Sequence, residues 1–236
     1  MTNIDSGAML GRYRLLERIG EGGMGDVWKA HDAHLDRDVA IKLLHRAGDE
    51  KSRERFRREA LVLSRLSHPG VATIFDFDSI EGCDFLVMEY VPGGTLASRV
   101  ARGPLSVDEI LRYGTAIAEA LDSAHRSGFL HRDLKPGNVV ISGHDHPKIL
   151  DFGIALLLNS GEGVPRITQA GMALGSIPYM SPEQLFGGAD DARVDIYSFG
   201  VMLYEMATGR LPFVKNRPEA LMYAIINNAA PSVRSR

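Results

Sequence analysis

Cysteine is almost absent from this sequence, since Cys83 is the single cysteine among 236 residues. One thiol can build neither a disulfide framework nor a cysteine-rich zinc site, so a reducing, cytoplasmic compartment is expected. No uninterrupted run of about 18 apolar residues occurs, which predicts that this chain holds no membrane-spanning segment. The first ten residues also lack the basic start and apolar stretch of a signal peptide. Membrane attachment through other regions is left open.

A strong charge of one sign is also missing. The chain carries 27 Lys and Arg against 30 Asp and Glu, for a formal net charge of -3. It therefore lacks the basic footprint of nucleic-acid-binding proteins, and no nucleic-acid partner is expected. With 44% hydrophobic residues, the chain can bury a substantial core in one large domain or in two unequal lobes.

The part of the chain before about residue 91 is dominated by short runs that are typical of strands. Rich in β-branched and aromatic residues, these runs are YRLLERI, GDVWKA, DVAIKLL, VATIFDF and DFLVMEYV. One helix is predicted over residues 51–66, where Phe56, Ala60 and Leu63 share a face with Glu59. The sequence SHPG then ends this helix.

After VPGG, at residues 91–94, the pattern becomes helical. Residues 106–109 (SVDE) predict a capping box for a helix that continues to about Arg126. A second helix is expected from about Asp195 to just before Gly209, and its apolar composition predicts burial on nearly every side. A third helix is expected over the PEALMYAII run.

These elements predict an α+β protein with two lobes. A small antiparallel β-sheet N-lobe with one main helix is followed by a larger, mainly helical C-lobe. As a single domain over residues 1–236, the protein would have its N-lobe at about 11–90, a hinge at about 89–94 and its C-lobe at about 95–236. Clefts between lobes are preferred ligand sites, so the functional site is expected there.

A glycine-rich segment, GEGGMGDV at residues 20–27, lies between two predicted strands. Residues without a Cβ let backbone N–H groups approach phosphate oxygens closely, so this segment could cradle a phosphate. On its spacing alone, a glycine-rich hairpin turn is equally well supported. A dinucleotide-binding fold is disfavoured because a strand, and not a helix, is predicted next.

Lys42 and Glu59 each interrupt an apolar pattern. In the strand DVAIKLL, alternation places Lys42 on one face with Ala40 and Leu44. Glu59 lies on the apolar face of the predicted helix. A lysine that extends from an edge strand is the ordinary alternative, but two opposite charges so placed are tolerated if they meet. This pattern favours an ion pair between Lys42 and Glu59.

The segment HRDLKPGN, residues 131–138, places unneutralised polar groups between two apolar stretches. Asp133 can accept a proton from a hydroxyl, Lys135 can neutralise a transferred phosphate, and Asn138 offers an oxygen to Mg²⁺. Asp151, in the sequence DFG after an apolar strand, offers a carboxylate to the same kind of hard cation. A solvated turn is the alternative for both segments.

A long irregular segment, residues 154–181, follows DFG and closes at the sequence SPE. Loops of this length inside compact domains are uncommon unless they are functional. The segment carries Ser160, Thr168 and Ser176 as phosphorylatable hydroxyls, although most loop hydroxyls are merely solvated.

Taken in order, GEGGMGDV, VAIK, HRDLKPGN, DFG and SPE resemble the signature set of a protein kinase. The resemblance covers about Tyr13 to Asn227. SHPGVATIFDF, VMEYVPGGTL and YMSPEQ resemble in particular the eukaryotic-like Ser/Thr kinases of bacteria. The resemblance implies the two-lobed protein-kinase fold. It also implies transfer of the γ-phosphate of ATP, with Mg²⁺ or Mn²⁺, to Ser and Thr hydroxyls of protein substrates and of the chain's own activation loop.

The resemblance assigns an ATP site to residues of both lobes. These residues are Ile19, Gly20, Gly22, Gly25, Val27, Ala40, Lys42, Met88, Glu89, Val91 and Val140. Lys42 would hold the α- and β-phosphates and be oriented by Glu59, and Met88 would be the gatekeeper beside the adenine. The backbones of Glu89 and Val91 would hydrogen-bond the adenine.

The resemblance also assigns the chemistry. Asp133 would orient and deprotonate the substrate hydroxyl, with Lys135 on the γ-phosphate. Asn138 and Asp151 would hold two Mg²⁺ ions. Asp195 would accept hydrogen bonds from the backbone of the HRD segment.

Regulation is implied by Arg132, which precedes the catalytic aspartate. Kinases with this arginine are usually activated when a phosphate on the activation loop pairs with the guanidinium. Thr168 is the candidate phosphorylation site, and Ser176 occupies the P+1 loop, where Thr is commoner.

One departure from the family pattern concerns the end of the chain. About two helices follow the PEALMYAII helix in the family, so the C-lobe is expected to be truncated and Glu183 to lack its arginine partner. Pairing with another chain, including a homodimer, is left open. The competing hypothesis is a pseudokinase that serves as an ATP-binding or scaffold module. A small-molecule kinase is disfavoured by the segment between DFG and SPE.

Overall fold

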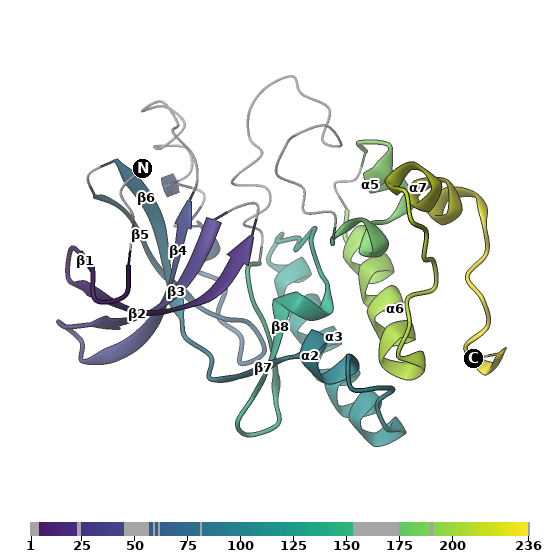
Figure 1. Ribbon diagram of the computed structural model, residues 1–236, viewed down its shortest axis with the longest axis horizontal. Coiled ribbons are helices and arrows are strands. Elements are labelled where there is room, and N and C mark those ends of the chain that lie inside the picture. Colours follow the sequence, from purple (N-terminus) through teal and green to yellow (C-terminus); the bar gives the residue numbers. More distant parts are fainter. Residues whose placement is uncertain are drawn as a thin grey trace. The chain divides into compact units, whose positions relative to one another are not determined.

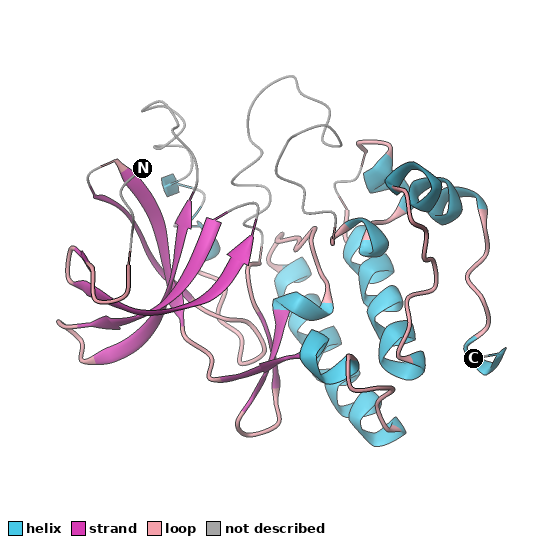
Figure 2. Ribbon diagram, in the orientation of Figure 1, coloured by secondary structure: helices cyan, strands magenta, loops and turns pink. Residues whose placement is uncertain are grey.

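The computed structural model describes residues 5–22, 25–44, 57–58, 60, 62–80, 82–152, 175–188 and 191–235. The chain divides into two compact units. The first comprises Met1–Ser67 and Ala72–Val91, and the second comprises His68–Val71 and Pro92–Arg236. The first unit is built on an antiparallel sheet and the second is mainly helical (Figure 2). The predicted α+β class is confirmed.

The first unit contains a six-stranded antiparallel sheet with the order β1-β2-β3-β4-β6-β5 (Figure 1). Its strands are β1 (Met9–Leu10), β2 (Tyr13–Gly22), β3 (Gly25–Asp32), β4 (Arg37–Leu44), β5 (Ile74–Ile80) and β6 (Cys83–Glu89). The five predicted strands correspond to β2 to β6, with two corrections. The two-residue strand β1 is too short to leave a pattern in the sequence. Strand β5 begins at Ile74 and not at Val71, because Val71 forms a bridge to Ile149 in the second unit.

The glycine-rich segment forms the end of the β2–β3 hairpin, where Gly22 pairs with Gly25. Gly25 has a φ angle of 142°, and a Cβ atom built on it would lie 1.6 Å from the carbonyl oxygen of Leu43 in β4. Only glycine allows β3 and β4 to approach so closely at this position. The hairpin alternative is therefore correct for the backbone, and phosphate binding stays a prediction. Residues 23–24 lie outside the described residues.

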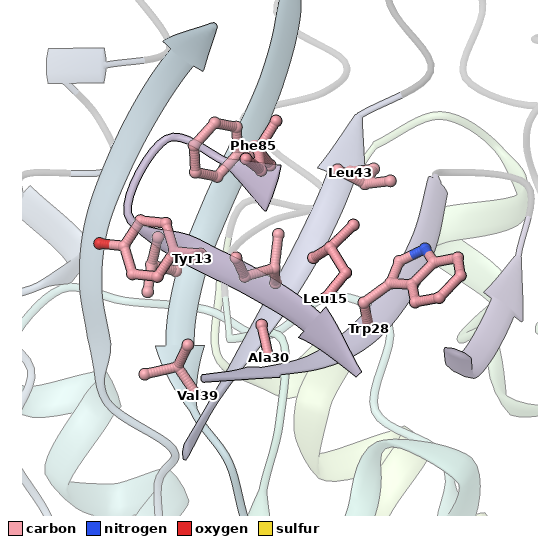
Figure 3. Packing of buried hydrophobic residues seen from close by; sticks show 10 residues of the cluster. Tyr13, Leu15, Trp28, Ala30, Val39, Leu43 and Phe85 are labelled. Carbon is pink, nitrogen blue, oxygen red and sulfur yellow. The ribbon is translucent and has the colours of Figure 1, made fainter. Parts of the chain in front are cut away.

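One face of this sheet carries the hydrophobic core of the first unit (Figure 3). The core consists of Leu10, Tyr13, Leu15, Trp28, Ala30, Val39, Ile41, Leu43, Phe85 and Val87. Burial of a large side chain of this kind stabilises the fold by about 1.5–3 kcal/mol. Since Val39, Ile41 and Leu43 point into the core, Ala40 and Lys42 belong to the opposite face of β4. The predicted alternation in this strand is confirmed.

The helix predicted over residues 51–66 is described only in part. Residues 51–56 and Glu59 lie outside the described residues, while the described positions between 57 and 63 are helical. Ala60 and Leu63 are buried, in agreement with the apolar face predicted for them.

The second unit is composed mainly of helices. They are α2 (Leu96–Val100), α3 (Val107–Arg126), α5 (Pro182–Leu185), α6 (Arg193–Thr208) and α7 (Pro218–Asn227), with short 3-10 turns η1 (Pro136–Asn138), η2 (Ile177–Tyr179) and η3 (Val233–Ser235). A three-stranded antiparallel sheet joins β7 (Gly93–Thr95), β8 (Val139–Ser142) and β9 (Pro147–Ile149). Helix α3 packs against α6 (Figure 1). Within the described part of the chain, no helix is both long and apolar enough to cross a bilayer.

The ends of these helices follow the capping rules used to predict them. The Ser106 side chain accepts the backbone N–H of Glu109, and the Glu109 carboxylate accepts that of Ser106, which completes the predicted capping box. Helix α6 ends at Gly209, whose φ angle of 68° lies in the left-handed region that glycine adopts easily. The third predicted helix is α7.

The prediction that α6 is buried on nearly every side is wrong for its first turn. Met202 and Met206 are fully buried, whereas Ile196 is 58% exposed. The helix is covered by α3 and by η2, and the side chain of Ile196 projects away from this cover. An apolar composition alone does not show which side of a helix its neighbours leave uncovered.

Candidate active site

A buried carboxylate at the start of α6 holds the backbone of the HRD segment. Asp195 is fully buried, and its two oxygens accept the backbone N–H groups of His131 and Arg132, each at 2.7 Å. His125, near the end of α3, donates from Nε2 to Oδ2 of Asp195 at 2.8 Å. A buried carboxylate is stable only with such partners. The hydrogen bonds expected for Asp195 are therefore confirmed.

The backbone that Asp195 holds is strained. Arg132 has a φ angle of 66°, which a residue with a Cβ adopts at a cost of about 1–3 kcal/mol. Such a conformation persists only where the surroundings fix it, and the bond from Arg132 N–H to Asp195 is one of the contacts that do so. The turn that leads into Asp133 is thus held in a single shape.

The His131 ring joins this turn to the strand that precedes DFG. Its Nδ1 accepts the backbone N–H of Asp133 at 3.2 Å, and its Nε2 donates to the carbonyl oxygen of Leu150 at 2.9 Å. These partners assign the ring hydrogen to Nε2. The fully buried ring also meets Phe152 edge to face, with centroids 5.0 Å apart. His131 therefore packs the HRD and DFG segments together.

Four polar side chains converge after this turn. Lys135 Nζ donates to Oδ2 of Asp133 at 2.8 Å and to Oγ of Ser176 at 2.7 Å. Asn138 Nδ2 donates to the backbone oxygen of Asp133 at 2.8 Å and to its Oδ2 at 3.3 Å. Both side-chain donors act on Oδ2, so the carboxylate of Asp133 is fixed in orientation and its Oδ1 can serve as an acceptor.

The β8–β9 hairpin brings the two predicted metal ligands to one end of a pair of strands. Asn138 directly precedes β8 and Asp151 follows β9, and the backbone N–H of Leu150 donates to the carbonyl oxygen of Asn138 at 2.8 Å. Asp151 has a φ angle of 56°, so the chain turns sharply there. Because Asn138 directs its Nδ2 to Asp133, its amide oxygen is the atom it can offer to a cation.

Four of the predicted nucleotide residues lie in the first unit, on the face of its sheet opposite the core. Lys42 is buried with 5% exposure, and it pairs with Val27 across β3. Ala40, two residues earlier on the same face, pairs with Met88 in β6. Both Ala40 and Met88 are buried.

Comparison with known proteins identifies the family of this chain. Residues 13–234 match the family model described as the protein kinase domain. The chain belongs to the protein kinase family.

Relatives of this kinase domain are found among bacterial enzymes. It is 43% identical over 239 residues to the serine/threonine-protein kinase PksC of Streptomyces coelicolor, covering 96% of this chain and 43% of PksC. It is 44% identical over 206 residues to the serine/threonine-protein kinase PrkC of Bacillus subtilis, covering 86% of this chain and 31% of PrkC. The chain spans between 30% and 43% of the length of the curated relatives it matches.

The remaining predicted nucleotide residues of the kinase domain differ in exposure. Ile19 is 45% exposed at the end of the hairpin, and Val140 in β8 is 6% exposed. Glu89 is tied to Thr73 twice, since its backbone N–H donates to the Thr73 oxygen at 2.8 Å and its Oε2 accepts the Thr73 N–H at 3.2 Å. Val91 is partly buried at the end of the first unit. Their contacts with ATP stay predictions.

Two of the predicted site residues lie outside the described residues. They are Glu59, the expected partner of Lys42, and Thr168, the expected phosphorylation site. Ser176 is described and buried, with the bond from Lys135 given above.

Two residues that contact the HRD segment or the carboxylate that holds it were not singled out by sequence reasoning. His125 donates to Asp195, and Gln184 donates from Nε2 to the carbonyl oxygen of Arg132 at 2.9 Å. His125 could have been noticed as a polar residue in the last turn of α3. Gln184 follows the SPE motif but carries no signal of its partner.

The segment around Tyr179 is held against α6 by a second, partly buried polar pair. Tyr179 donates its hydroxyl to Oε2 of Glu205 at 2.6 Å, and Ser198 Oγ donates to the backbone oxygen of Tyr179 at 2.8 Å. Burial raises the pKa of Tyr179, and the Glu205 carboxylate raises it further. Burial also raises the pKa of Glu205, while the hydrogen bond from Tyr179 lowers it.

Proposed function

We propose that this kinase domain transfers the γ-phosphate of ATP to Ser and Thr hydroxyls of protein substrates, including its own activation loop. The observation that carries the proposal is the cluster of Asp133, Lys135 and Asn138 on a turn whose backbone is held by the buried Asp195. Phosphoryl transfer depends mainly on positioning and on electrostatic stabilisation, which such a rigid turn supplies.

Asp133 is the proposed acceptor of the substrate proton. Its Oδ2 accepts from Lys135 and Asn138, so Oδ1 is the proposed acceptor that orients an incoming hydroxyl. Lys135 holds the negative charge of the transferred phosphoryl group, and its bond to Ser176 ties this position to the P+1 loop. A positioned general base of this kind contributes about 10²- to 10⁴-fold to the rate.

Asn138 and Asp151 are the proposed ligands of Mg²⁺. Both offer oxygen atoms, and Mg²⁺ is usually bound by one or two protein side chains together with substrate phosphates. When bound, Mg²⁺ neutralises the phosphate oxygens during transfer.

In the first unit, Lys42 is the proposed partner of the α- and β-phosphates, oriented by Glu59. Its position on the sheet face opposite the core, with Ala40 on the same face and Val27 across from it, supports this role. Ala40, Val27 and Met88 on the same face are proposed to contact the adenine. We place both units in one kinase domain, joined at a hinge over residues 89–94.

The proposed switch is a phosphate on Thr168 that pairs with Arg132. The backbone of Arg132 is already fixed by Asp195, so an ion pair at its guanidinium orders the loop against a rigid support.

The test compares the protein with an Asp133→Asn variant. Both are incubated with γ-labelled ATP, Mg²⁺ and a generic basic protein, and phosphosites on the chain are mapped by mass spectrometry. Wild type is expected to label itself and the acceptor, and the variant to lose about 10²- to 10⁴-fold in rate while still binding ATP. Equal signals from the two proteins would overturn the proposal. ATP binding without transfer by wild type would support the pseudokinase alternative instead.

A further inference from the structure

The side chain of Gln184, directly after the SPE motif, bonds to the turn that leads into Asp133, which we call the catalytic turn. Its Nε2 donates to the carbonyl oxygen of Arg132 at 2.9 Å, and its Oε1 accepts the backbone N–H of Ser181 at 3.0 Å. Its own backbone N–H donates to Ser181 Oγ at 3.3 Å, which completes a capping box at the start of α5. One amide group therefore bonds to two segments that lie far apart in the sequence.

These two bonds also fix the orientation of the amide. An amide has one acceptor end and one donor end, and exchanging them would place oxygen against the Arg132 oxygen and N–H against the Ser181 N–H. Gln184 is partly buried, and α5 holds its backbone in place. The donor is thus aimed at Arg132 by the same contacts that cap α5.

The group that receives this donor is the peptide bond that precedes Asp133. Its carbonyl oxygen, on Arg132, accepts from Gln184, and its N–H, on Asp133, donates to Nδ1 of His131 at 3.2 Å. The N–H of Arg132 itself donates to Asp195. Because Arg132 has a φ angle of 66°, this peptide plane follows a strained residue and requires external support. Gln184 supports the one end of the plane that Asp195 and His131 do not contact.

We propose that Gln184 is a positioning residue for phosphoryl transfer, which it aids by holding the Arg132–Asp133 peptide plane and with it the Asp133 carboxylate. This inference rests on the proposed function, in which Asp133 is the acceptor of the substrate proton. A rotation of this plane would carry Asp133 away from Lys135 and Asn138. The residue acts through the backbone and does not touch the substrate.

The chemistry of the capping box separates this role from a purely structural one. Glu and Gln serve equally well at the third position of a capping box, because only the side-chain oxygen is used there. The amide nitrogen is needed only for Arg132. Gln184→Glu therefore keeps the cap and removes the donor, whereas Gln184→Met removes both without adding a charge.

The experiment measures kcat, KM for ATP and melting temperature for wild type, Gln184→Glu, Gln184→Met and Ser106→Ala. The Ser106 variant removes the N-cap of α3 and serves as the control for lost stability. We expect Gln184→Glu to lower kcat on the order of tenfold, the value of one hydrogen bond, with unchanged KM and a smaller fall in melting temperature than in Gln184→Met. Gln184→Met is expected to share the loss of kcat and also to melt earlier, and Ser106→Ala only to melt earlier.

Amide hydrogen exchange over residues 130–138 provides a readout that does not require activity. Exchange is expected to be faster in both Gln184 variants and unchanged in Ser106→Ala. If wild type transfers phosphate while Gln184→Glu keeps its kcat and its exchange rates, the inference is wrong and the proposed function stands. If wild type transfers no phosphate but the exchange difference is found, the proposed function fails and the support of the turn by Gln184 stands. A loss of kcat in Gln184→Glu alone, absent from Gln184→Met, would assign the effect to the added charge and overturn the inference.

Discussion

Replacement of Asp195 by Asn tests whether the catalytic turn is held by one buried carboxylate. The carboxylate accepts three donors: two backbone N–H groups, on His131 and Arg132, and the Nε2 of His125. Asparagine has nearly the same shape, but it offers one acceptor oxygen and one N–H₂ group. Whichever way the amide turns, at least one buried N–H then faces another N–H.

The expected cost follows from these bonds. If the amide oxygen occupies the position of Oδ2, it keeps His131 and His125 and leaves the Arg132 N–H without its acceptor. A hydrogen bond to a charged group contributes about 1.5–3 kcal/mol, and a buried donor left unpaired costs about 1–3 kcal/mol. Both figures describe the loss of the same bond and do not add, so a loss of about 1–3 kcal/mol is expected. For a chain of this size, that corresponds to a fall in melting temperature of roughly 2–12 °C.

The assay is thermal unfolding followed by circular dichroism, together with amide exchange at His131 and Arg132 and the rate of phosphate transfer. Asp191→Asn is the matched control. Asp191 lies four residues before Asp195 and pairs with Arg193 at the surface, so the same chemical change there should have little effect on stability. An Asp195→Asn protein that melts with wild type and keeps slow exchange at both amides would refute the claim that this carboxylate holds the turn.

Two further predictions concern ionisable groups, one buried (Lys42) and one partly buried (Glu205). Lys42→Met should lower the rate of phosphate transfer by about 10²- to 10³-fold, because the ammonium is the proposed partner of the nucleotide phosphates. The melting temperature should change little, because methionine fills a similar volume. A large loss of stability would contradict this prediction. Burial raises the pKa of Glu205 in the folded state. At pH values between the ordinary and the raised pKa, the folded state therefore holds a proton that the unfolded state releases. The free energy of unfolding consequently falls as the pH rises through that range. Glu205→Gln should therefore raise the melting temperature at pH 8. The gain should shrink as the pH falls below about 4, where the carboxyl of Glu205 becomes protonated in both states. A gain that is constant with pH would show that burial of the charge is not its cause.

Local patterns in the sequence were sufficient for the elements whose ends depend on near neighbours. The α3 capping box involves Ser106 and Glu109, three residues apart, and the end of α6 depends on the single residue Gly209. The face of Lys42 followed from the alternation of β4. The grouping of Asp133, Lys135 and Asn138 was predictable because the three residues lie on one short turn.

Features set by distant neighbours were not predictable in the same way. Strand β1 exists because Met9 and Leu10 pair with β2, and two residues carry no period. The exposure of Ile196 depends on which sides of α6 are covered by other elements. The requirement for glycine at position 25 comes from its φ angle of 142° in the hairpin and also from the carbonyl oxygen of Leu43 on another strand.

The residues that hold the catalytic turn show why motifs describe only part of a site. His125 and Asp195 are 70 residues apart, and Gln184 and Arg132 are 52 apart, so no window of the sequence contains either pair. Each of these contacts ends on the backbone of the turn or on the carboxylate that binds it. A backbone group accepts any donor of suitable geometry, so its partner leaves no complementary residue type in the sequence. The chemistry of the site can thus be predicted from the residues of the turn itself. The residues that hold Asp133 in place can be found only from the structure. At these positions, conservative substitutions should alter turnover without altering the motif.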